Sequence, residues 1–435
     1  MNCRSNDPDP AYLGVVWQPE VPAVDDKVDI VIIGGGIMGM SIAFQVARRS
    51  KMSVVVLEKG HGLGEGSTGG SSAITRQRYT KAESVRIARD GNVVWRNWCQ
   101  YTGLSDPVGR FHDIGVLWMM NESAAEVAAD RDRLVAVGID AVMVDAEGLA
   151  EMYPGLSACM VPFDLTGEVE HECSDGGAFL IERDTGFFDA TGALEDVAAA
   201  ARVGGVDIRM RAEVVDVNLD GGRVRGVTLA DGSTIHAGLV INATGPWCNA
   251  INAMAGLEMP WSLVPTRVQV MYRALPPAVP RPIPVVGDAA GGVYFRPEAG
   301  GGQIILGSIL EEDELEEADP NDYNEAADRA FIDLKIHALH HRIPALPYVG
   351  VPGGMASLYT VNRQDVHPIV GPTSIDGFAV ANGFSGHGFK ESQMIGSMMA
   401  QWITGERADF DTDVPMRFFA VDRDPIDIED HSVLA

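Results

Sequence analysis

The sequence is short of three things: cysteine, positive charge and long hydrophobic runs. Its five cysteines include no C-x-x-C pair in 435 residues, so we expect reduced thiols rather than a disulfide framework, and no metal site. Lys and Arg total 33 against 61 Asp and Glu, for a formal net charge of -28. This balance argues against nucleic acid or an anionic membrane surface as a partner, because both attract positively charged protein surfaces.

Two further absences bear on location. No stretch reaches the roughly eighteen uninterrupted apolar residues of a transmembrane helix. The first twenty-six residues also lack a basic start followed by an apolar core. The sequence therefore predicts neither a membrane span nor a signal peptide. We expect a cytoplasmic protein that acts on a small molecule, with oligomerisation left open.

The part that is rich in pattern begins with a strand, a helix and a second strand. Residues 28–33 are a continuous apolar run of strand length, and residues 37–49 repeat apolar side chains at helical spacing. Residues 53–57 form a second run that is typical of a buried strand. This order is a βαβ unit, which predicts the start of a parallel sheet.

The glycines between the first strand and the helix carry a nucleotide-binding motif. They fit G-x-G-x-x-G, and Glu58 ends the second strand nineteen residues after Gly39. Gly34 permits the tight turn, Gly36 lets a pyrophosphate approach the backbone, and Gly39 brings the helix close to the strand. Glu58 can accept hydrogen bonds from ribose hydroxyls, which favours FAD or NAD over NADP. The dinucleotide contacts predicted here are Gly34, Gly36, Ile37, Met38, Gly39 and Glu58.

The next segment favours FAD over NAD. Residues 59–79, KGHGLGEGSTGGSSAITRQRY, are rich in Gly and Ser and poor in apolar side chains. An NAD-binding unit would continue with another helix and strand, whereas extended polar backbone suits a longer ligand; a mobile surface loop is the alternative. The acidic residues 311–325 are interpreted as a solvated loop without a function.

Four motifs give the chain a resemblance to a known family. They are DIVIIGGGIMGMSIAFQVA, VVVLEKG followed by GSTGGSSAITRQRY, LVINATGPW, and VANGFSGHGFKESQMIG. Together they cover nearly the whole chain. The sequence resembles the D-amino-acid oxidase superfamily of FAD amine oxidoreductases, and within it the branch of sarcosine oxidase, dimethylglycine dehydrogenase and glycine oxidase.

The resemblance implies an α/β fold with two domains. One is a Rossmann-like FAD-binding domain of the glutathione-reductase type, and the other is an α+β substrate domain built on an antiparallel sheet. The expected ranges are 26–85, 180–255 and 350–405 for the FAD-binding domain, 86–179 and 256–349 for the substrate domain, and 1–25 and 406–435 for terminal extensions.

Later motifs complete the expected cofactor site. An apolar strand ends at Thr244 and Gly245, where backbone can close over the adenine and pyrophosphate side. The glycine loop 383–388 offers N–H groups to the flavin pyrimidine ring, and the helix after it points its positive end there. We interpret His387, between two glycines, as packing and backbone support. The further FAD contacts, with Val214 implied by the resemblance, are Lys59, Ser67, Thr68, Ile74, Val214, Thr244, Gly245, Trp247, Gly386, His387, Gly388 and Lys390.

Two cations are the expected substrate ligands. Lys390 lies in the first turn of a helix, which is an electrostatically poor place for a cation. The resemblance implies that Arg76 and Lys390 hold a substrate carboxylate, the first as a planar fork and the second as a point charge. Tyr294 is the expected wall of the substrate pocket, with a core aromatic as the alternative.

The chain departs from its relatives at several positions. Relatives with covalent flavin carry a His in the GST segment or a Cys before the YT motif, whereas this chain has residues 67–70 (STGG) and Ser357 there. The FAD should therefore be non-covalent. Ile305 and Ile309 replace a Lys and a His of monomeric sarcosine oxidases, which bears on oxygen reactivity. The substrate-binding Arg of glycine oxidase falls near Tyr359.

The expected reaction is oxidation of the C–N bond of a small amino acid with a substituent on nitrogen. A hydride would pass to flavin N5, the imine would hydrolyse, and O₂ would be reduced to H₂O₂. Sarcosine, dimethylglycine, iminodiacetate and glycine are the candidate substrates. Two alternatives stay open: a dehydrogenase of the same fold that passes electrons to a carrier, and a non-catalytic FAD-binding assembly factor.

Overall fold

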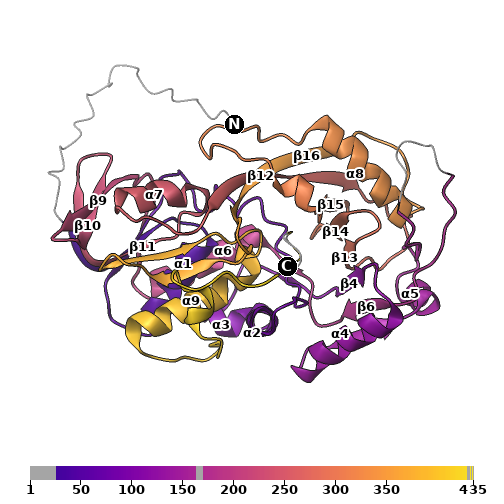
Figure 1. Cartoon of the computed structure of the whole chain (residues 1–435), viewed down its shortest axis with the longest axis horizontal. Coiled ribbons are helices and arrows are strands. Elements are labelled where there is room, and N and C mark those ends of the chain that lie inside the picture. The colour runs from indigo at the N-terminus through magenta and orange to yellow at the C-terminus, as the bar shows by residue number, and fades with distance from the viewer. Residues whose placement is uncertain (1–25, 163–169, 429–431, 433, 435) are drawn as a thin grey trace, which may run out of the picture.

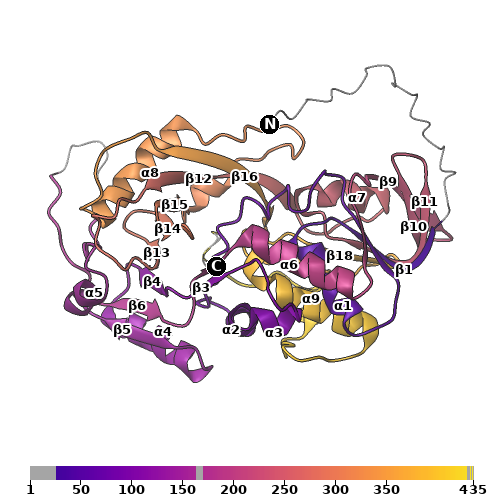
Figure 2. The same cartoon turned by 180° about the vertical axis from the view of Figure 1, so that it is seen from behind.

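The structure is a computed structural model that describes residues 26–162, 170–428, 432 and 434. The chain forms two lobes, each built on one large sheet, and the lobes lie side by side along the long axis (Figures 1 and 2). The last described residues end between the lobes (Figure 1). Within the described ranges, no helix combines the length and apolar character needed to cross a bilayer.

The first sheet has a parallel centre. Its order is β17-β18-β11-β1-β2-β8, and β10 and β9 extend from β11. The pairs β18–β11, β11–β1, β1–β2 and β2–β8 are parallel, while β17 is an antiparallel edge strand. The strands are β1 (Asp26–Ile33), β2 (Val54–Leu57), β8 (Asp207–Arg209), β9 (Val214–Asp220), β10 (Arg223–Leu229), β11 (Thr234–Asn242), β17 (Ile369–Pro372) and β18 (Phe378–Asn382).

Both faces of this sheet are covered, which is why its central strands are apolar on both sides. Ile30 and Ile32 of β1 pack into a core with the helices α1, α6 and α9, whereas Val31 and Ile33 pack with β9, β10 and α7 on the other face. The helices of this lobe are α1 (Ile37–Ala47), α2 (Ala82–Arg96), α3 (Trp98–Thr102), α6 (Ala190–Val203), α7 (Cys248–Met254) and α9 (Gly388–Thr404), with the 3₁₀ turns η1 (Gly245–Trp247) and η3 (Met416–Phe419).

The second sheet is mostly antiparallel, in the order β16-β12-β15-β14-β13-β4-β6-β5. Its one parallel pair is β13–β4. The strands are β4 (Val116–Met119), β5 (Ala141–Val144), β6 (Phe179–Glu182), β12 (Leu263–Ala274), β13 (Val285–Asp288), β14 (Val293–Pro297), β15 (Gln303–Ser308) and β16 (Gly353–Asn362). The other elements of this half are α4 (Ala124–Ala136), α5 (Ala146–Met152), η2 (Glu311–Glu314) and α8 (Arg329–Arg342), and β3 (Phe111–His112) and β7 (Phe187–Phe188) form a separate ladder.

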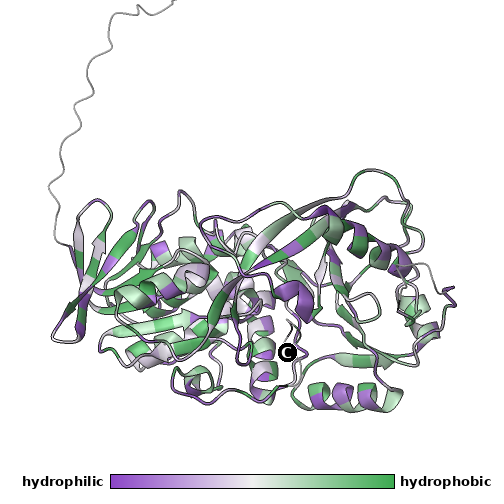
Figure 3. Ribbon diagram, turned by 45° about the horizontal axis from the view of Figure 1, so that its top comes forward, coloured by the Kyte–Doolittle hydropathy of each residue, from purple (hydrophilic) through white to green (hydrophobic). Residues whose placement is uncertain are grey.

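Hydropathy follows this architecture. Hydrophobic residues gather in the strands of both sheets, and hydrophilic residues mark the outward faces of the surface helices (Figure 3). The result is an α/β fold with one mixed, mainly parallel sheet and one mainly antiparallel sheet, in agreement with the expected class.

The expected domain ranges and the two sheets differ at two strands. β6 and β16 fall inside ranges expected for the FAD-binding domain, but both pair within the second sheet. β16 is 10 residues long and runs antiparallel to β12 along its whole length. It also contacts η1 of the first lobe. β16 is therefore an element that joins the two halves of the molecule.

Candidate functional site

A cavity of about 580 Å³ lies between the two lobes. Both lobes and the end of the chain supply its wall, including Trp118 of β4 and Leu434. Among the predicted site residues, the wall contains Gly34, Gly36, Ile37, Met38, Glu58, Lys59, Ser67, Thr68, Ile74, Arg76, Val214, Thr244, Gly245, Trp247, Tyr294, Gly386, Gly388 and Lys390. Gly39 and His387 do not line it.

The turn between β1 and α1 requires glycine at positions 34 and 39, because a Cβ at either would collide with backbone. Gly34 has φ +111°, and a Cβ there would lie 2.5 Å from the carbonyl oxygen of Ala243. A Cβ on Gly39 would lie 2.1 Å from the carbonyl oxygen of Gly34. Gly39 therefore acts through close packing of α1 on the turn, behind the cavity wall. The helix N-terminus that results is an anion-binding site.

Polar groups fix the loop at this end of the cavity. Glu58 accepts hydrogen bonds from the backbone N–H of Gly35 at 2.8 Å and of Gly60 at 2.7 Å. The hydroxyl of Thr68 accepts from the N–H of Ile37 at 3.1 Å, in the first turn of α1. A carboxylate has further lone pairs, so Glu58 can still accept from ribose hydroxyls.

Lys59 and Trp247 make a cation–π contact in the same wall of the cavity. The Lys59 ammonium lies 3.9 Å from the centroid of a Trp247 ring. Both side chains donate to Oδ1 of Asn321, Lys59 at 3.2 Å and Trp247 at 2.7 Å. Asn321 belongs to the acidic segment 311–325, so part of that segment closes the cofactor end of the cavity.

The glycine loop 383–388 lies at the other end. Ser385 and Gly386 have φ of +46° and +83°, and the N–H of Ser385 donates to the carbonyl of Thr360 at 3.0 Å. The loop leads directly into α9, and no side-chain cap among the described residues covers that helix N-terminus. His387 is buried and packs edge-to-face on Tyr79, with ring centroids 5.5 Å apart.

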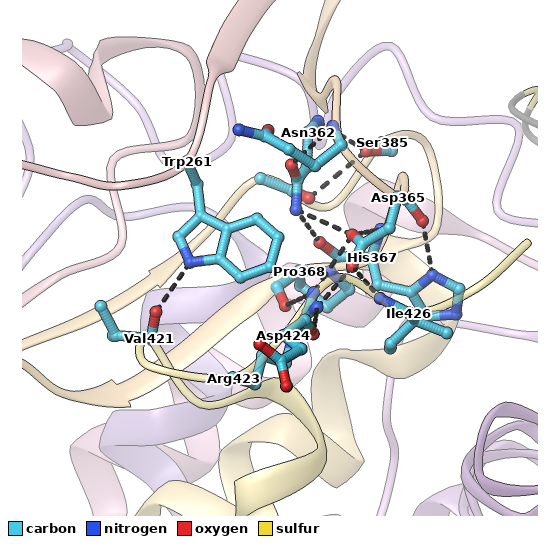
Figure 4. Close-up of polar contacts among 12 residues, drawn as sticks. Trp261, Asn362, Asp365, His367, Pro368, Ser385, Val421, Arg423, Asp424 and Ile426 are labelled. Carbon is cyan, nitrogen blue, oxygen red and sulfur yellow. Dashed lines mark hydrogen bonds and ion pairs between the residues drawn. The ribbon is translucent and has the colours of Figure 1, made fainter.

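A buried polar network holds this loop from behind (Figure 4). The hydroxyl of Ser385 accepts from the N–H of Asn362 at 3.0 Å, and the Asn362 side chain donates to Asp365 at 2.9 Å. Asp365 also ion-pairs with Arg423 and accepts from the N–H of Ile426 at 2.8 Å. The C-terminal segment is thereby tied to the loop that ends at α9.

Arg76 is held by groups that the sequence analysis did not identify. Its guanidinium lies 3.9 Å from the centroid of the Tyr79 ring, and it donates to the carbonyl of Arg78. The buried Glu182 carboxylate of β6 accepts from the backbone N–H groups of Gln77 at 2.7 Å and Arg78 at 3.2 Å. Trp118, which lines the cavity, donates to the same carboxylate at 2.7 Å. The sequence signal that could have identified Glu182 is its place as the acidic residue at the end of the apolar run FLIE.

Lys390 and Glu391 form a buried, mutually dependent pair at the start of α9. Burial and the charge of Arg76 lower the pKa of Lys390 to about 7, although Glu391 and Glu314 oppose the shift. Burial raises the pKa of Glu391 to about 7, against the effect of Lys390 and Arg76. Oε2 of Glu391 finds no hydrogen-bond partner among the described residues. The sequence predicted a helix after the glycine loop but not the burial of Glu391 in its first turn.

Tyr294 of β14 and Tyr359 of β16 interact through their side chains, and both line the cavity. Burial raises the pKa of Tyr294, and the nearby charge of Glu314 adds to that effect. Burial likewise raises the pKa of Tyr359 well above its usual range. Glu314 is only 5% exposed, so this part of the acidic segment is not the solvated loop that the sequence predicted.

Another buried arginine, Arg296, lies beside the position discussed for oxygen reactivity. Ile305 pairs across strands with Arg296, and Ile305 and Ile309 are both buried and absent from the cavity wall. Arg296 donates to the carbonyl of Ser72 at 2.7 Å and lies 4.1 Å from the Phe187 ring centroid. It supports the wall segment around Ser72 without lining the cavity.

The sequence predicted no metal site, because its cysteines include no C-x-x-C pair. The fold brings Cys159, His171, Cys173 and His341 together in space, away from the cavity. This cluster is taken up below.

The residues present fit FAD. The cradle at Gly34 and Gly36, the N-termini of α1 and α9, and Glu58 all border one cavity. A Cβ at Gly34 would collide with the backbone of Ala243, so the tight turn that presents the N-terminus of α1 to the cavity requires glycine there.

Comparisons with known proteins agree. The family model described as "FAD dependent oxidoreductase" matches residues 29–402. FAD-dependent oxidoreductase domain-containing protein 1 of Xenopus laevis is 26% identical over 89% of this chain and 82% of its own length. Sarcosine oxidase subunit beta of Rhizobium meliloti (strain 1021) is also 26% identical, over 89% of this chain and 87% of its own. Mitochondrial dimethylglycine dehydrogenase of Homo sapiens is 25% identical over 89% of this chain and 43% of its own length.

Solved structures share the fold. L-proline dehydrogenase from P. horikoshii superposes with a TM-score of 0.76 and 25% identity, covering 92% of this chain and 98% of its own. Glycine oxidase from Geobacillus kaustophilus gives a TM-score of 0.71 and 20% identity, covering 92% and 99%. With a family model matched across residues 29–402 and a cavity shaped for the dinucleotide, the chain belongs to the FAD dependent oxidoreductase family.

Proposed function

We propose that this protein oxidises the C–N bond of a small amino acid that carries a substituent on nitrogen. The observation behind the proposal is that two buried cations, Arg76 and Lys390, border the same cavity as the cofactor-binding residues. Tyr79 lies close to both, 3.9 Å from the guanidinium carbon of Arg76 and 5.9 Å from the ammonium of Lys390. The two cations therefore converge on one place, where they suit a carboxylate.

Each residue has a definite task in this proposal. Arg76 binds and orients the substrate carboxylate as a fork, and Lys390 adds a point charge when protonated. Glu391 holds or releases a proton beside Lys390, which sets the net charge of the site. Bound FAD supplies the electron acceptor, and the protein supplies orientation and exclusion of water.

The nature of the amine is supported by the cavity wall and by the names of relatives. Trp118, Tyr294 and Tyr359 give the wall aromatic surface, which suits an N-alkyl group and a substituted ammonium. Relatives are named for dimethylglycine, sarcosine and L-proline, and the nitrogen of each of these carries an additional carbon substituent.

A substrate screen with matched variants tests the proposal. Anaerobic bleaching of the flavin absorbance would be followed with sarcosine, dimethylglycine, proline, iminodiacetate, glycine and amines that lack a carboxylate. In Arg76→Ala and Lys390→Ala we expect kcat/KM to fall by about 30-fold to several thousand-fold, the equivalent of about 2–5 kcal/mol for a lost buried charged partner. Arg86→Ala is the control, because Arg86 is partly exposed and pairs with Glu83.

Three results would contradict the proposal. They are equal turnover of amines that lack a carboxylate, normal kinetics in both cation variants, and a primary amino acid with the highest kcat/KM. Retention of FAD without bleaching by any amine would instead favour a non-catalytic FAD-binding assembly factor.

A second candidate is a dehydrogenase that passes electrons to a carrier. Ile305 and Ile309, where monomeric sarcosine oxidases have a Lys and a His, are neutral, buried and away from the cavity wall. Two of the relatives are named dehydrogenases. Turnover with an artificial electron acceptor, compared with oxygen consumption by the same preparation, separates the two candidates.

A further inference from the structure

Away from the flavin cavity, the side chains of two cysteines and two histidines gather in one place. Cys159, His171 and Cys173 belong to the connection between α5 and β6, and His341 is in the last turn of α8. One ligand atom from each lies within 4.8 Å of the other three. No residue of this cluster lines the flavin cavity.

The three separations from His171 match the edges of a tetrahedral zinc site. Nε2 of His171 lies 3.5 Å from Sγ of Cys159, 3.5 Å from Sγ of Cys173 and 3.2 Å from Nε2 of His341. Zinc bonds of about 2.3 Å to sulfur and about 2.0–2.1 Å to nitrogen place S and N about 3.5 Å apart, and two N atoms about 3.3 Å apart, along the edges of a tetrahedron.

Hydrogen bonding alone accounts less well for this arrangement. One imidazole nitrogen offers either a single N–H or a single lone pair, yet Nε2 of His171 has three polar atoms within 3.5 Å. The rings of His171 and His341 meet at 85°, with centroids 4.8 Å apart. Their nitrogens therefore approach a common point from different directions, as ligands of one ion do.

The backbone holds the two cysteines in place without the ion. Residues 158–160 pair with residues 174–176 through hydrogen bonds of 2.9 Å and 3.0 Å. These contacts pair Cys159 with Asp175, and Cys173 lies two residues before Asp175 on the neighbouring segment.

The end of α8 is fixed to the same segment. Arg342, which follows His341, forms a fully buried ion pair with Asp288 at 2.8 Å. The carbonyl of Arg342 accepts from the N–H of Ser157 at 2.9 Å, and its guanidinium donates back to the Ser157 carbonyl. The fourth ligand is thus positioned by contacts that do not depend on the metal.

We propose that Cys159, His171, Cys173 and His341 bind one zinc ion. Two thiolates neutralise the charge of Zn²⁺, and two neutral imidazoles complete a four-coordinate shell. Because protein side chains fill all four positions, the site is structural rather than catalytic. It would fasten the connection after α5 to the end of α8, both of which lie in the lobe opposite β9 and β10 (Figure 1). Cys173 is exposed, which gives the ion a route of entry.

The test uses the full-length, FAD-loaded protein. After treatment with a chelator and a thiol reductant, the protein is incubated with equimolar zinc, passed through gel filtration and analysed by mass spectrometry for metal per chain. We expect about one zinc per chain, as a four-ligand structural site implies. Cys173→Ser and His341→Gln should each weaken zinc binding by at least about tenfold. Cys99→Ser, an exposed cysteine elsewhere, should keep the metal.

Cobalt gives a second readout that needs no variant. Co²⁺ in the wild-type protein should show the sulfur-to-metal charge-transfer absorption of thiolate ligation, measured against the same protein without cobalt. If this absorption is absent, the proposal is wrong. That conclusion holds even if a variant loses FAD and cannot be interpreted. A wild-type protein that retains no zinc would also overturn it, as would zinc retained in both ligand variants. A Cys159–Cys173 disulfide in the protein as purified, together with no zinc retained after reduction, would show a redox pair instead.

Discussion

At the scale of single residues, the site is governed by two adjacent side chains whose protonation is linked. Lys390 and Glu391 both have a pKa of about 7, the first lowered and the second raised by burial. Below that pH the pair carries a positive charge, because Lys390 is protonated and Glu391 is neutral. Above it the pair becomes negative, because Lys390 loses its proton and Glu391 ionises. The two groups titrate as a unit.

This linkage predicts that carboxylate binding weakens as pH rises through about 7. The dissociation constant of a non-oxidisable carboxylate, followed by perturbation of the flavin spectrum, should rise by up to about tenfold per pH unit for each proton taken up on binding. Lys390→Met should make the profile shallower, because only Glu391 of the pair is left to titrate. Glu391→Gln should bind more tightly than wild type at high pH, where it removes a negative charge. A pH-independent constant in the wild type would contradict the charge assignment.

A second prediction at this scale concerns Glu182, which we consider a positioning residue for Arg76. In Glu182→Gln the side chain keeps one acceptor oxygen, but its amide N–H₂ faces N–H groups that the carboxylate accepted from. The segment that carries Arg76 should therefore shift. We expect KM to rise with FAD content unchanged, and the free energy of unfolding to fall by about 1–3 kcal/mol. Asp333→Asn is the control, because Asp333 pairs with Arg329 at the surface. An effect on kcat alone would speak against positioning of the substrate ligand.

At the scale of elements, what the sequence predicted was local. The strand–turn–helix around Gly34, the acid at Glu58 and the glycine loop before α9 are all consecutive patterns, and the structure has them where expected. What the sequence did not show depends on distant pairing. β16 joins the second sheet because it matches β12, and Glu182 meets Arg76 only because β6 ends beside that segment. Glu314 is buried for the same reason, although its neighbours in the sequence are acidic.

The β1–α1 turn offers a prediction at the element scale. A Cβ at Gly39 would approach the Gly34 carbonyl oxygen to 2.1 Å, so Gly39→Ala should push α1 away from β1 and distort the pyrophosphate cradle. We expect FAD content after purification to fall at least about tenfold, the equivalent of about 1.4 kcal/mol in binding. Gly177→Ala is the matched control, because a Cβ there meets no atom within 4 Å. Normal FAD content in Gly39→Ala would show that the turn can adjust.

At the scale of the whole molecule, the cavity that fits the cofactor lies between two lobes joined by β16 and by the C-terminal segment. Ser357 and Gly70, near the positions of covalent links in relatives, are adjacent, since a Cβ at Gly70 would lie 2.5 Å from the Ser357 hydroxyl. Neither residue can form a thioether or histidyl bond. We therefore expect acid precipitation to release all the FAD into the supernatant, measured by its absorbance. Flavin that stays with the pellet would contradict the non-covalent prediction.

The reaction of the reduced protein with oxygen is also a property of the whole cavity. Oxygen gains negative charge as it is reduced, and a nearby buried cation stabilises that charge. Ile305 supplies none, and Arg296 lies behind the cavity wall rather than in it. Arg76 and Lys390 remain, and Lys390 is charged only below about pH 7. We therefore expect a slow oxidase, whose photoreduced form reoxidises faster below pH 7 than above it in stopped-flow mixing with oxygenated buffer. Lys390→Met should reduce this pH dependence to the part that Glu391 causes, and a bound carboxylate should slow the wild type. Reoxidation far slower than turnover with an artificial acceptor, at every pH, would identify a dehydrogenase.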